Sequence, residues 1–249
     1  LYMENPLFLK LAADVENTLG KLKEAKDHYW TYYNLNPQAP SGDIVLARIA
    51  DIYLRDGQKK AAREIYDKAI KDFPDSEGAL VSKMRLAEEG IYDDPTEPVM
   101  STVFDRPYNV LPRDTYIEIA TKHPDSPLAP LALLKLAMWH AWNKQYGDAL
   151  GAVQDLLDRY PKNDLAPRAR ELGDKTFALA VPQLIADGNY GRVTQWWEKY
   201  AFVNRDKADD DTRLGVATSY WKTGEPDKAL ALIQRYLTKT QVPTYSEMA

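Results

Sequence analysis

Cysteine is missing from this chain altogether, and its absence removes several kinds of chemistry at once. With no cysteine among 249 residues, the protein can have no disulfide framework, no zinc-thiolate site and no thiol nucleophile. A chain without cysteine is compatible with the cytosol and equally with the periplasm. Cysteine usage therefore does not decide the compartment.

An excess of positive charge is missing as well. Lysine and arginine number 32 against 37 aspartates and glutamates, which gives a formal net charge of −5. Binding to DNA, RNA or an anionic membrane surface depends on clustered positive charge. We therefore expect none of these as a partner.

The chain also has no long hydrophobic run. Its most apolar stretch, residues 131–142, is interrupted by Lys135 and is shorter than the roughly 20 residues that cross a bilayer. We expect no transmembrane segment. The sequence opens at Leu1 without a basic region and an apolar signal core, so we expect a piece of a longer chain, with any signal peptide or lipid anchor outside it.

Groups that could support catalysis are few. The three histidines, His28, His123 and His140, show no metal-ligand spacing. The glycines are spread along the chain and form no phosphate-binding loop. We therefore expect no catalytic residue, no metal, no cofactor and no enzymatic activity.

Two further clusters have simple structural interpretations. The acidic run Asp209–Asp211 precedes a predicted helix, where negative charge complements the helix dipole. Of the adjacent Trp196 and Trp197, the second falls on a predicted core position, and packing is favoured over sugar stacking for the pair.

Punctuating residues recur at one interval, which indicates an internal repeat. A spacing of 37 residues separates Pro37 from Pro74, Pro124 from Pro161, and Gly20 from Gly57. Between the first two prolines, apolar residues recur three or four positions apart, as on one face of a helix. Gly57 suits a left-handed helix end and Pro74 stops the next helix. Small Ala50 and Ala62 allow close approach, so the segment predicts two antiparallel helices.

The same pattern predicts about six helix pairs, and hence one all-α domain over residues 1–249, a right-handed α-solenoid. In the third pair, Leu86 and Ala87 occupy the phase of Ile49 and Ala50. The stretch 93–110 contains three prolines and is predicted to be an inserted loop. Three residues that follow boundary prolines are predicted to cap the next helix: Ser76, Ser126 and Asn163.

This arrangement of small, aromatic, glycine and proline positions resembles the tetratricopeptide repeat family. Two junctions, His123–Pro130 and Tyr160–Pro167, place Ala-Pro in the first turn of the following helix. They resemble the repeat subtype of bacterial envelope proteins, namely outer-membrane barrel-assembly lipoproteins and Tol-associated periplasmic proteins. That resemblance implies a periplasmic or outer-membrane-associated scaffold, although a cytoplasmic protein is compatible with the composition.

In stacked helix pairs the first helices line the concave wall, and here their inward positions are mostly apolar. We therefore predict that a protein or peptide partner contacts the following residues: Met84, Glu88, Leu134, Met138, Trp142, Leu214 and Trp221. An apolar wall favours a hydrophobic or amphipathic segment. The same side chains could instead pack against neighbouring repeats.

The predicted function is a non-enzymatic interaction scaffold. Two alternatives stay open, because a helical solenoid can also be the scaffold of a larger cell-wall enzyme, or can assemble with itself through exposed terminal helices.

Overall fold

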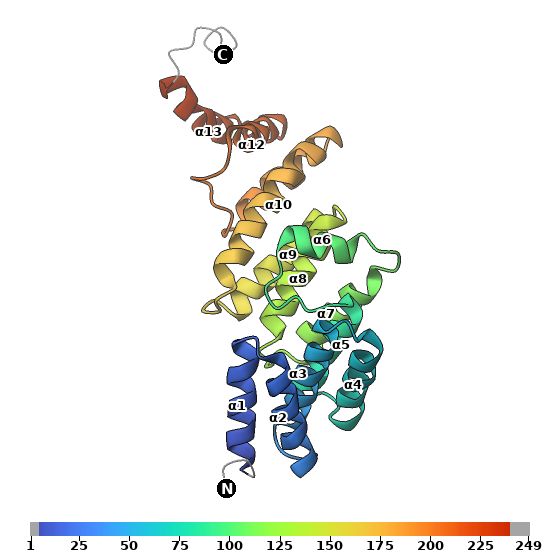
Figure 1. Cartoon of the computed structure of the whole chain (residues 1–249). Coiled ribbons are helices and arrows are strands. Elements are labelled where there is room, and N and C mark those ends of the chain that lie inside the picture. The colour runs from blue at the N-terminus through green and yellow to red at the C-terminus, as the bar shows by residue number, and fades with distance from the viewer. Residues whose placement is uncertain (1–4, 240–249) are drawn as a thin grey trace. The chain divides into compact units, whose positions relative to one another are not determined.

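The computed structural model describes residues 5–239, and throughout this range the regular structure is α-helical, with thirteen helices and no strand (Figure 1). The prediction of an all-α solenoid built from helix pairs is confirmed. The chain divides into two compact units, Leu1–Ala132 and Leu133–Ala249. That residues 1–249 form one continuous domain stays a prediction.

The first unit is built from three helix pairs and one short extra helix. Its helices are α1 (Pro6–Thr18), α2 (Leu22–Leu35), α3 (Gly42–Arg55), α4 (Lys59–Asp72), α5 (Glu77–Glu88), α6 (Glu97–Phe104) and α7 (Val110–Lys122). The pairs are α1 with α2, α3 with α4, and α5 with α7. Adjacent pairs also touch, because α3 packs against both α2 and α5.

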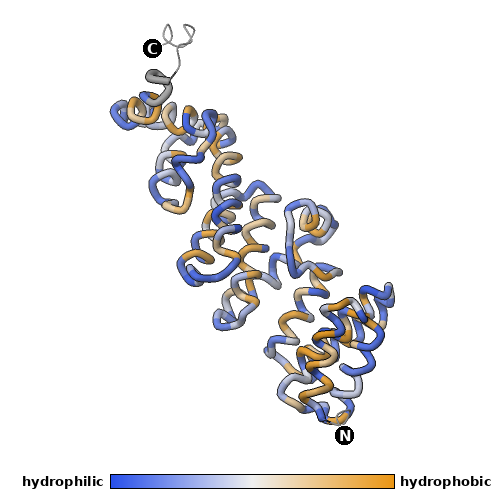
Figure 2. The backbone as a smooth tube through the Cα atoms, turned by 60° about the vertical axis from the view of Figure 1, so that its left-hand side comes forward, coloured by the Kyte–Doolittle hydropathy of each residue, from blue (hydrophilic) through white to orange (hydrophobic). Residues whose placement is uncertain are grey.

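The second unit continues the same construction. Its helices are α8 (Ala129–Trp142), whose first turn precedes the boundary, α9 (Tyr146–Arg159), α10 (Ala166–Ala186), α11 (Tyr190–Lys199), α12 (Asp210–Lys222) and α13 (Pro226–Lys239). Here α10 packs against α9, α11 and α12, and α12 packs against α13. Hydrophobic and hydrophilic residues alternate along the helices of both units (Figure 2), as helices with one buried face require.

One backbone device ends the first helix of every pair. A residue with positive φ stands at each of these ends: Gly20, Gly57, Glu89, Lys144, Gly188 and Gly224. In each case the next N–H donates to the carbonyl five residues before it, as Gln58 does to Tyr53 over 2.9 Å. This is the closure that a left-handed residue makes possible at a helix end, and it confirms the turn predicted at Gly57.

A buried residue stands seven positions before each of these turns. The six are Ala13, Ala50, Ser82, Ala137, Val181 and Ala217, and none is more than 4% exposed. Five of them are alanine or serine, so the helices can approach closely there.

This spacing corrects the register of the third pair. The left-handed residue is Glu89, so the counterpart of Ala50 is Ser82 and not Ala87. The error arose because Leu86 and Ala87 imitate Ile49 and Ala50, while the helix end is made by a glutamate that carries no sequence signal for a left-handed turn.

The sequence predicts that the inserted segment 93–110 is a loop, but part of it is helical. Residues 97–104 form α6, whose first turn contains Pro98, where proline is compatible with a helix. The helix buries Met100, Val103 and Phe104. Three apolar residues at helical spacing thus supply the core contact that stabilises a helix of only two turns.

One of the three predicted caps is confirmed. Ser76 is the N-cap of α5, and its hydroxyl accepts from the Ala79 N–H. The Ser126 and Asn163 side chains instead accept from N–H groups two residues ahead, Leu128 at 3.2 Å and Leu165 at 2.9 Å. They stabilise the turn that precedes the helix, because Ala-Pro in the first helical turn delays the helix start.

Alanine substitutions at two glycines test whether positive φ is what the helix-end turn requires. Gly57 has φ +76° and Gly151 lies inside α9, and an added Cβ would meet nothing within 4 Å at either site. We expect Gly57→Ala to lower the free energy of unfolding by about 1 kcal/mol through backbone strain. Gly151→Ala should raise it by about 0.5–1 kcal/mol. Urea denaturation measures both, and equal effects of the two substitutions would contradict the assignment.

Candidate functional site

The seven residues predicted to contact a partner separate into two groups by exposure. Four are buried: Met84, Glu88, Leu134 and Met138, all at 7% exposure or less. Three are open to solvent, namely Trp142 at 48%, Leu214 at 43% and Trp221 at 61%. Their role in binding stays a prediction, and only the exposed group offers side chains to a partner without rearrangement.

The corrected register explains why Met84 is buried. Counted from Glu89, the positions of α5 equivalent to Asp51, Leu54 and Arg55 are Lys83, Leu86 and Ala87. Met84 corresponds to the buried Ile52 and faces inward. Glu88 corresponds to the exposed Asp56 and is buried here by its own contact, because its carboxylate accepts from the Tyr116 hydroxyl at 2.6 Å. Burial of the phenol beside this carboxylate raises the pKa of Tyr116.

In the first unit, the first helix of each pair carries a polar residue directly after its buried small residue, where an apolar wall was expected. The position after each buried small residue is Asp14, Asp51 or Lys83. Asp14 accepts from Tyr29 at 2.7 Å and Asp51 from Tyr66 at 2.6 Å. Each carboxylate thus accepts a hydrogen bond from a tyrosine fifteen residues ahead, in the second helix of its own pair. The sequence did not reveal this contact between the two helices, although the spacing of fifteen residues repeats.

A buried ionic cluster connects the second helix pair to the third. The Arg85 guanidinium donates to the Asp51 carboxylate, with its Nε 3.2 Å from Oδ1, and both side chains are 2% exposed. Arg85 also binds Asp93, which follows α5. Burial and the Asp51 charge raise the pKa of Tyr66. The cluster joins α3, α4, α5 and the start of the inserted segment, and it gives Asp93 a structural role.

The ionic cluster should contribute strongly to stability. Asp51→Ala leaves the Arg85 charge buried without its main partner, and we expect a loss of about 3–5 kcal/mol in the free energy of unfolding. Tyr66→Phe removes one hydrogen bond and should cost about 1–2 kcal/mol. Lys68→Gln, which breaks an exposed pair with Asp72, is the control and should change stability by less than about 0.5 kcal/mol. Losses of similar size in all three would refute the assignment.

In the second unit, α12 carries an apolar stripe on its exposed side. Leu214, Thr218 and Trp221 are spaced by four and three residues and lie on one face, while Val216 and Tyr220 are buried on the other. We call these three residues the α12 stripe. The Lys222 ammonium lies 4.4 Å from the Trp221 ring centre, so a cation accompanies the exposed indole.

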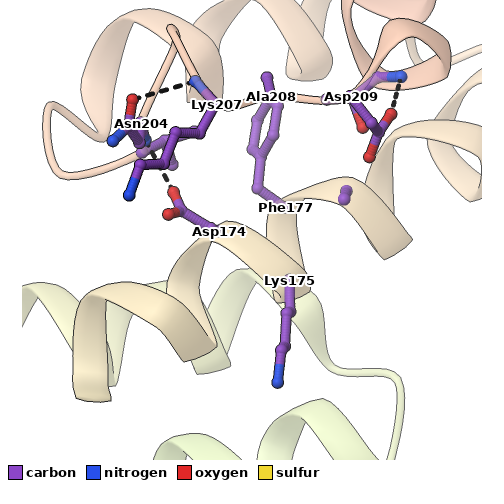
Figure 3. Close-up of a pocket in the computed structure, with 10 residues that line it drawn as sticks. Asp174, Lys175, Phe177, Asn204, Lys207, Ala208 and Asp209 are labelled. Carbon is purple, nitrogen blue, oxygen red and sulfur yellow. Dashed lines mark hydrogen bonds between the residues drawn. The ribbon is translucent and has the colours of Figure 1, made fainter. Parts of the chain in front are cut away.

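A small pocket lies between α10 and the segment before α12 (Figure 3). Its volume is about 180 Å³, with Phe177, Asp174 and Lys207 among its lining residues. The Asp174 carboxylate accepts from the Asn204 N–H at 2.7 Å, and Asn204 accepts from the Lys207 N–H. The volume of the pocket is below the several hundred Å³ of a typical small-molecule site. The Asn204–Asp174 hydrogen bond attaches the connecting loop to α10, and the Lys207–Asn204 bond closes a turn within the loop.

Asp209, at the edge of this pocket, is the N-cap of α12. Its carboxylate accepts from the Thr212 N–H at 2.6 Å, and this hydrogen bond holds its pKa below the ordinary value. Asp210 and Asp211 follow in the first turn. The structural interpretation of the acidic run is confirmed.

Removing this cap should lower the free energy of unfolding by an amount that depends on pH. We expect Asp209→Ala to cost about 1 kcal/mol of stability near neutral pH. Because the pKa of Asp209 is lowered on folding, its contribution is present above about pH 4 and is lost as the pH falls through the folded-state pKa. Asp209→Asn keeps a cap oxygen and should show a smaller loss without that titration. Thermal unfolding between acid and neutral pH measures both, and a pH-independent difference for the alanine variant would be inconsistent with capping.

The remaining candidates for chemistry have structural partners. His28 pairs with Glu16 at 2.7 Å, and His140 with Gln145 at the same distance. Trp197 is buried against Phe177, while the half-buried Trp196 packs on Tyr200. Within residues 5–239, no group of three or more His, Asp or Glu is arranged to hold a metal ion.

None of the helices in the described range combines the length and the apolar character of a membrane-spanning segment.

Paired antiparallel helices with a left-handed turn define the class of helical repeat proteins. The sequence model of the tetratricopeptide repeat matches residues 45–76 and 131–163, which span most of α3 with α4 and most of α8 with α9. The chain therefore contains tetratricopeptide repeats, and the resemblance seen in the phased prolines is confirmed for these two segments.

The solved structures that are similar to the chain include the following two. One is a tetratricopeptide repeat protein from Parabacteroides merdae ATCC 43184, with 16% identity over 95% of this chain and 80% of the other, and a TM-score of 0.46. The second is PilW, described as a widely conserved type IV pilus biogenesis factor, with 14% identity over 95% of both chains and a TM-score of 0.44. No curated protein matches the sequence.

Proposed function

We propose that the protein is a scaffold that binds a short apolar segment of a partner protein, and that the α12 stripe is its main contact. The observation that carries the proposal is the exposure of Trp221, at 61%. Large aromatic side chains normally hide most of their surface. Tyr220, next to it in sequence, is only 4% exposed.

Exposed tryptophan is well suited to this role. Tryptophan is enriched among the residues that carry most of the binding energy of interfaces, because its large rigid surface is buried at a small cost in conformational entropy. Leu214, seven residues earlier on the same face and 43% exposed, extends the apolar surface by about two helical turns, or about 10 Å. A partner helix of two to three turns can lie along this length, and so can a strand of two to three residue pairs.

The charges beside the stripe indicate the composition of the partner. Lys222 lies over the Trp221 ring, and Asp211 is exposed one turn before Leu214. An apolar segment with an acidic residue near the Trp221 end would complement the lysine. The exposed Trp142 of α8 is a second candidate contact, and its participation remains part of the original prediction.

We also propose that this scaffold works in the bacterial envelope. The support is the pair of Ala-Pro junctions, which open α8 at Ala129 and α10 at Ala166. The two junctions share one turn geometry, with the Ala129 and Ala166 N–H groups donating to carbonyls three residues earlier.

The binding role can be tested with peptides selected by display on the full chain. For peptides that bind, we expect Trp221→Ala to weaken affinity by about 30-fold or more, the effect of losing a central aromatic contact. Leu214→Asp should also weaken binding, because it places a charge in the apolar stripe. The measurement is titration calorimetry with the wild type and each variant.

Leu230 provides the matched control. It is 51% exposed on α13, so Leu230→Ala removes an exposed apolar side chain outside the stripe and should leave affinity unchanged. If the selected peptides bound the Trp221→Ala variant as tightly as the wild type, the α12 stripe would not be the binding face.

A further inference from the structure

Within residues 5–239, helix α1 carries an exposed apolar face. Large apolar side chains on α1 and at its C-cap are exposed as follows: Leu7 79%, Phe8 41%, Leu11 63%, Val15 49% and Leu19 66%. We call these five residues the α1 face. At 3.6 residues per turn they fall within an arc of about 120°. Scattered exposed leucines are common, but five on one helix face form a contiguous patch of the kind that marks an interface.

The opposite side of α1 is already occupied. Leu9 and Ala13 are fully buried where α1 packs against α2, and α1 lies at the edge of the first unit, with α2 and α3 to one side of it (Figure 1). Asn5 caps the helix by accepting from the Leu7 N–H at 3.0 Å. The α1 face is therefore presented by a helix that is fixed at its first turn and along its inner side.

The charges that border this face are self-complementary. Lys10 and Asp14 lie on one edge and form an ion pair of 2.8 Å within the helix, while Glu16 lies on the other edge, paired with His28. In an antiparallel pairing of two identical helices, each edge meets the same edge of the second copy. Lys10 then stands opposite Asp14 of the second copy. A parallel pairing would instead bring Asp14 near Glu16 of the other copy, and like charges disfavour it.

The apolar positions fit the same antiparallel arrangement. With Lys10 opposite Asp14, the two-fold axis passes near residue 12, which is also the mean position of the five apolar residues. Leu11 then lies next to Leu11 of the second copy, and Val15 lies near its Phe8. The side chains of the two helices alternate along the seam, as interdigitated packing requires.

We infer that the protein forms a two-fold symmetric homodimer through the α1 face, with the two α1 helices antiparallel and centred near residue 12. Such an isologous contact closes on itself and does not propagate into a filament. The helix is about 20 Å long, so the contact buries a few hundred Å² on each copy, less than the roughly 800 Å² of a standard stable interface. The dimer should therefore be weak and depend on concentration. This inference is independent of the α12 stripe.

Sedimentation of the full chain from about 1 to about 300 µM, the range in which a weak dimer forms, tests the inference. We expect the mass to rise from monomer toward dimer, and Leu11→Glu to raise the dissociation constant at least tenfold with unchanged circular dichroism. Leu230→Glu, which alters a leucine on α13 that is 51% exposed, should leave the association intact. A mass that stays monomeric over the whole range, or association that survives Leu11→Glu, would overturn the proposal.

The geometry can be tested separately, because the chain has no cysteine and any disulfide must come from an introduced one. In the antiparallel pairing, Leu11→Cys places two thiols close to the two-fold axis and should give a covalent dimer on mild oxidation. Leu19→Cys places them about 20 Å apart along the seam and should remain uncrosslinked. Equal crosslinking of both variants would indicate parallel pairing and contradict the inferred arrangement.

Discussion

The close approach of two helices at a small buried residue, seven positions before a left-handed turn, is the constraint on which the rest of this structure depends. The turn reverses the chain only if the backbone can take positive φ, and the helices can then pack only if the side chain between them is small. Ala50 with Gly57 shows both requirements met by residues with the right intrinsic preferences. Ser82 with Glu89 shows the same geometry made by a residue without that preference, where packing against α7 and the Arg85 cluster holds the turn in place.

On this shared frame the two units use different side chains between their helices. In the first unit, carboxylates on the first helices bind tyrosines on the second helices, and at Asp51 an arginine from the next pair joins them. Burying these charges favours one register, because a shift of one residue would leave a charged group without its partner. In the second unit, the core cluster includes Phe177, Trp197 and Tyr220, and Trp197 occupies the position that Tyr66 has in the first unit. The exposed side of α12 is left apolar. The surfaces open to partners differ accordingly.

Sequence patterns located the helices well and the surface less well. The phased prolines and glycines predicted the turns within one or two residues, because those residues act on the backbone locally. Leu214 and Trp221, predicted as partner contacts, are exposed on α12, and their role in binding stays a prediction. Met84, Glu88, Leu134 and Met138 are buried, and their role in binding stays a prediction. Helix α6 was missed because its stability comes from burying Met100 and Phe104, which local propensity does not report.

By itself, the sequence determined the repeat period, the helix pairing and the exclusion of thiol chemistry, because each follows from local backbone preference or from composition. Only the tertiary structure decided which side chains remain exposed. Exposure depends on which face of each helix its neighbours cover, and a single residue's difference in register turns that face by about 100°. For this reason the apolar residues of α1, ordinary members of a periodic pattern in the sequence, emerge as an uncovered face only when the helices are packed.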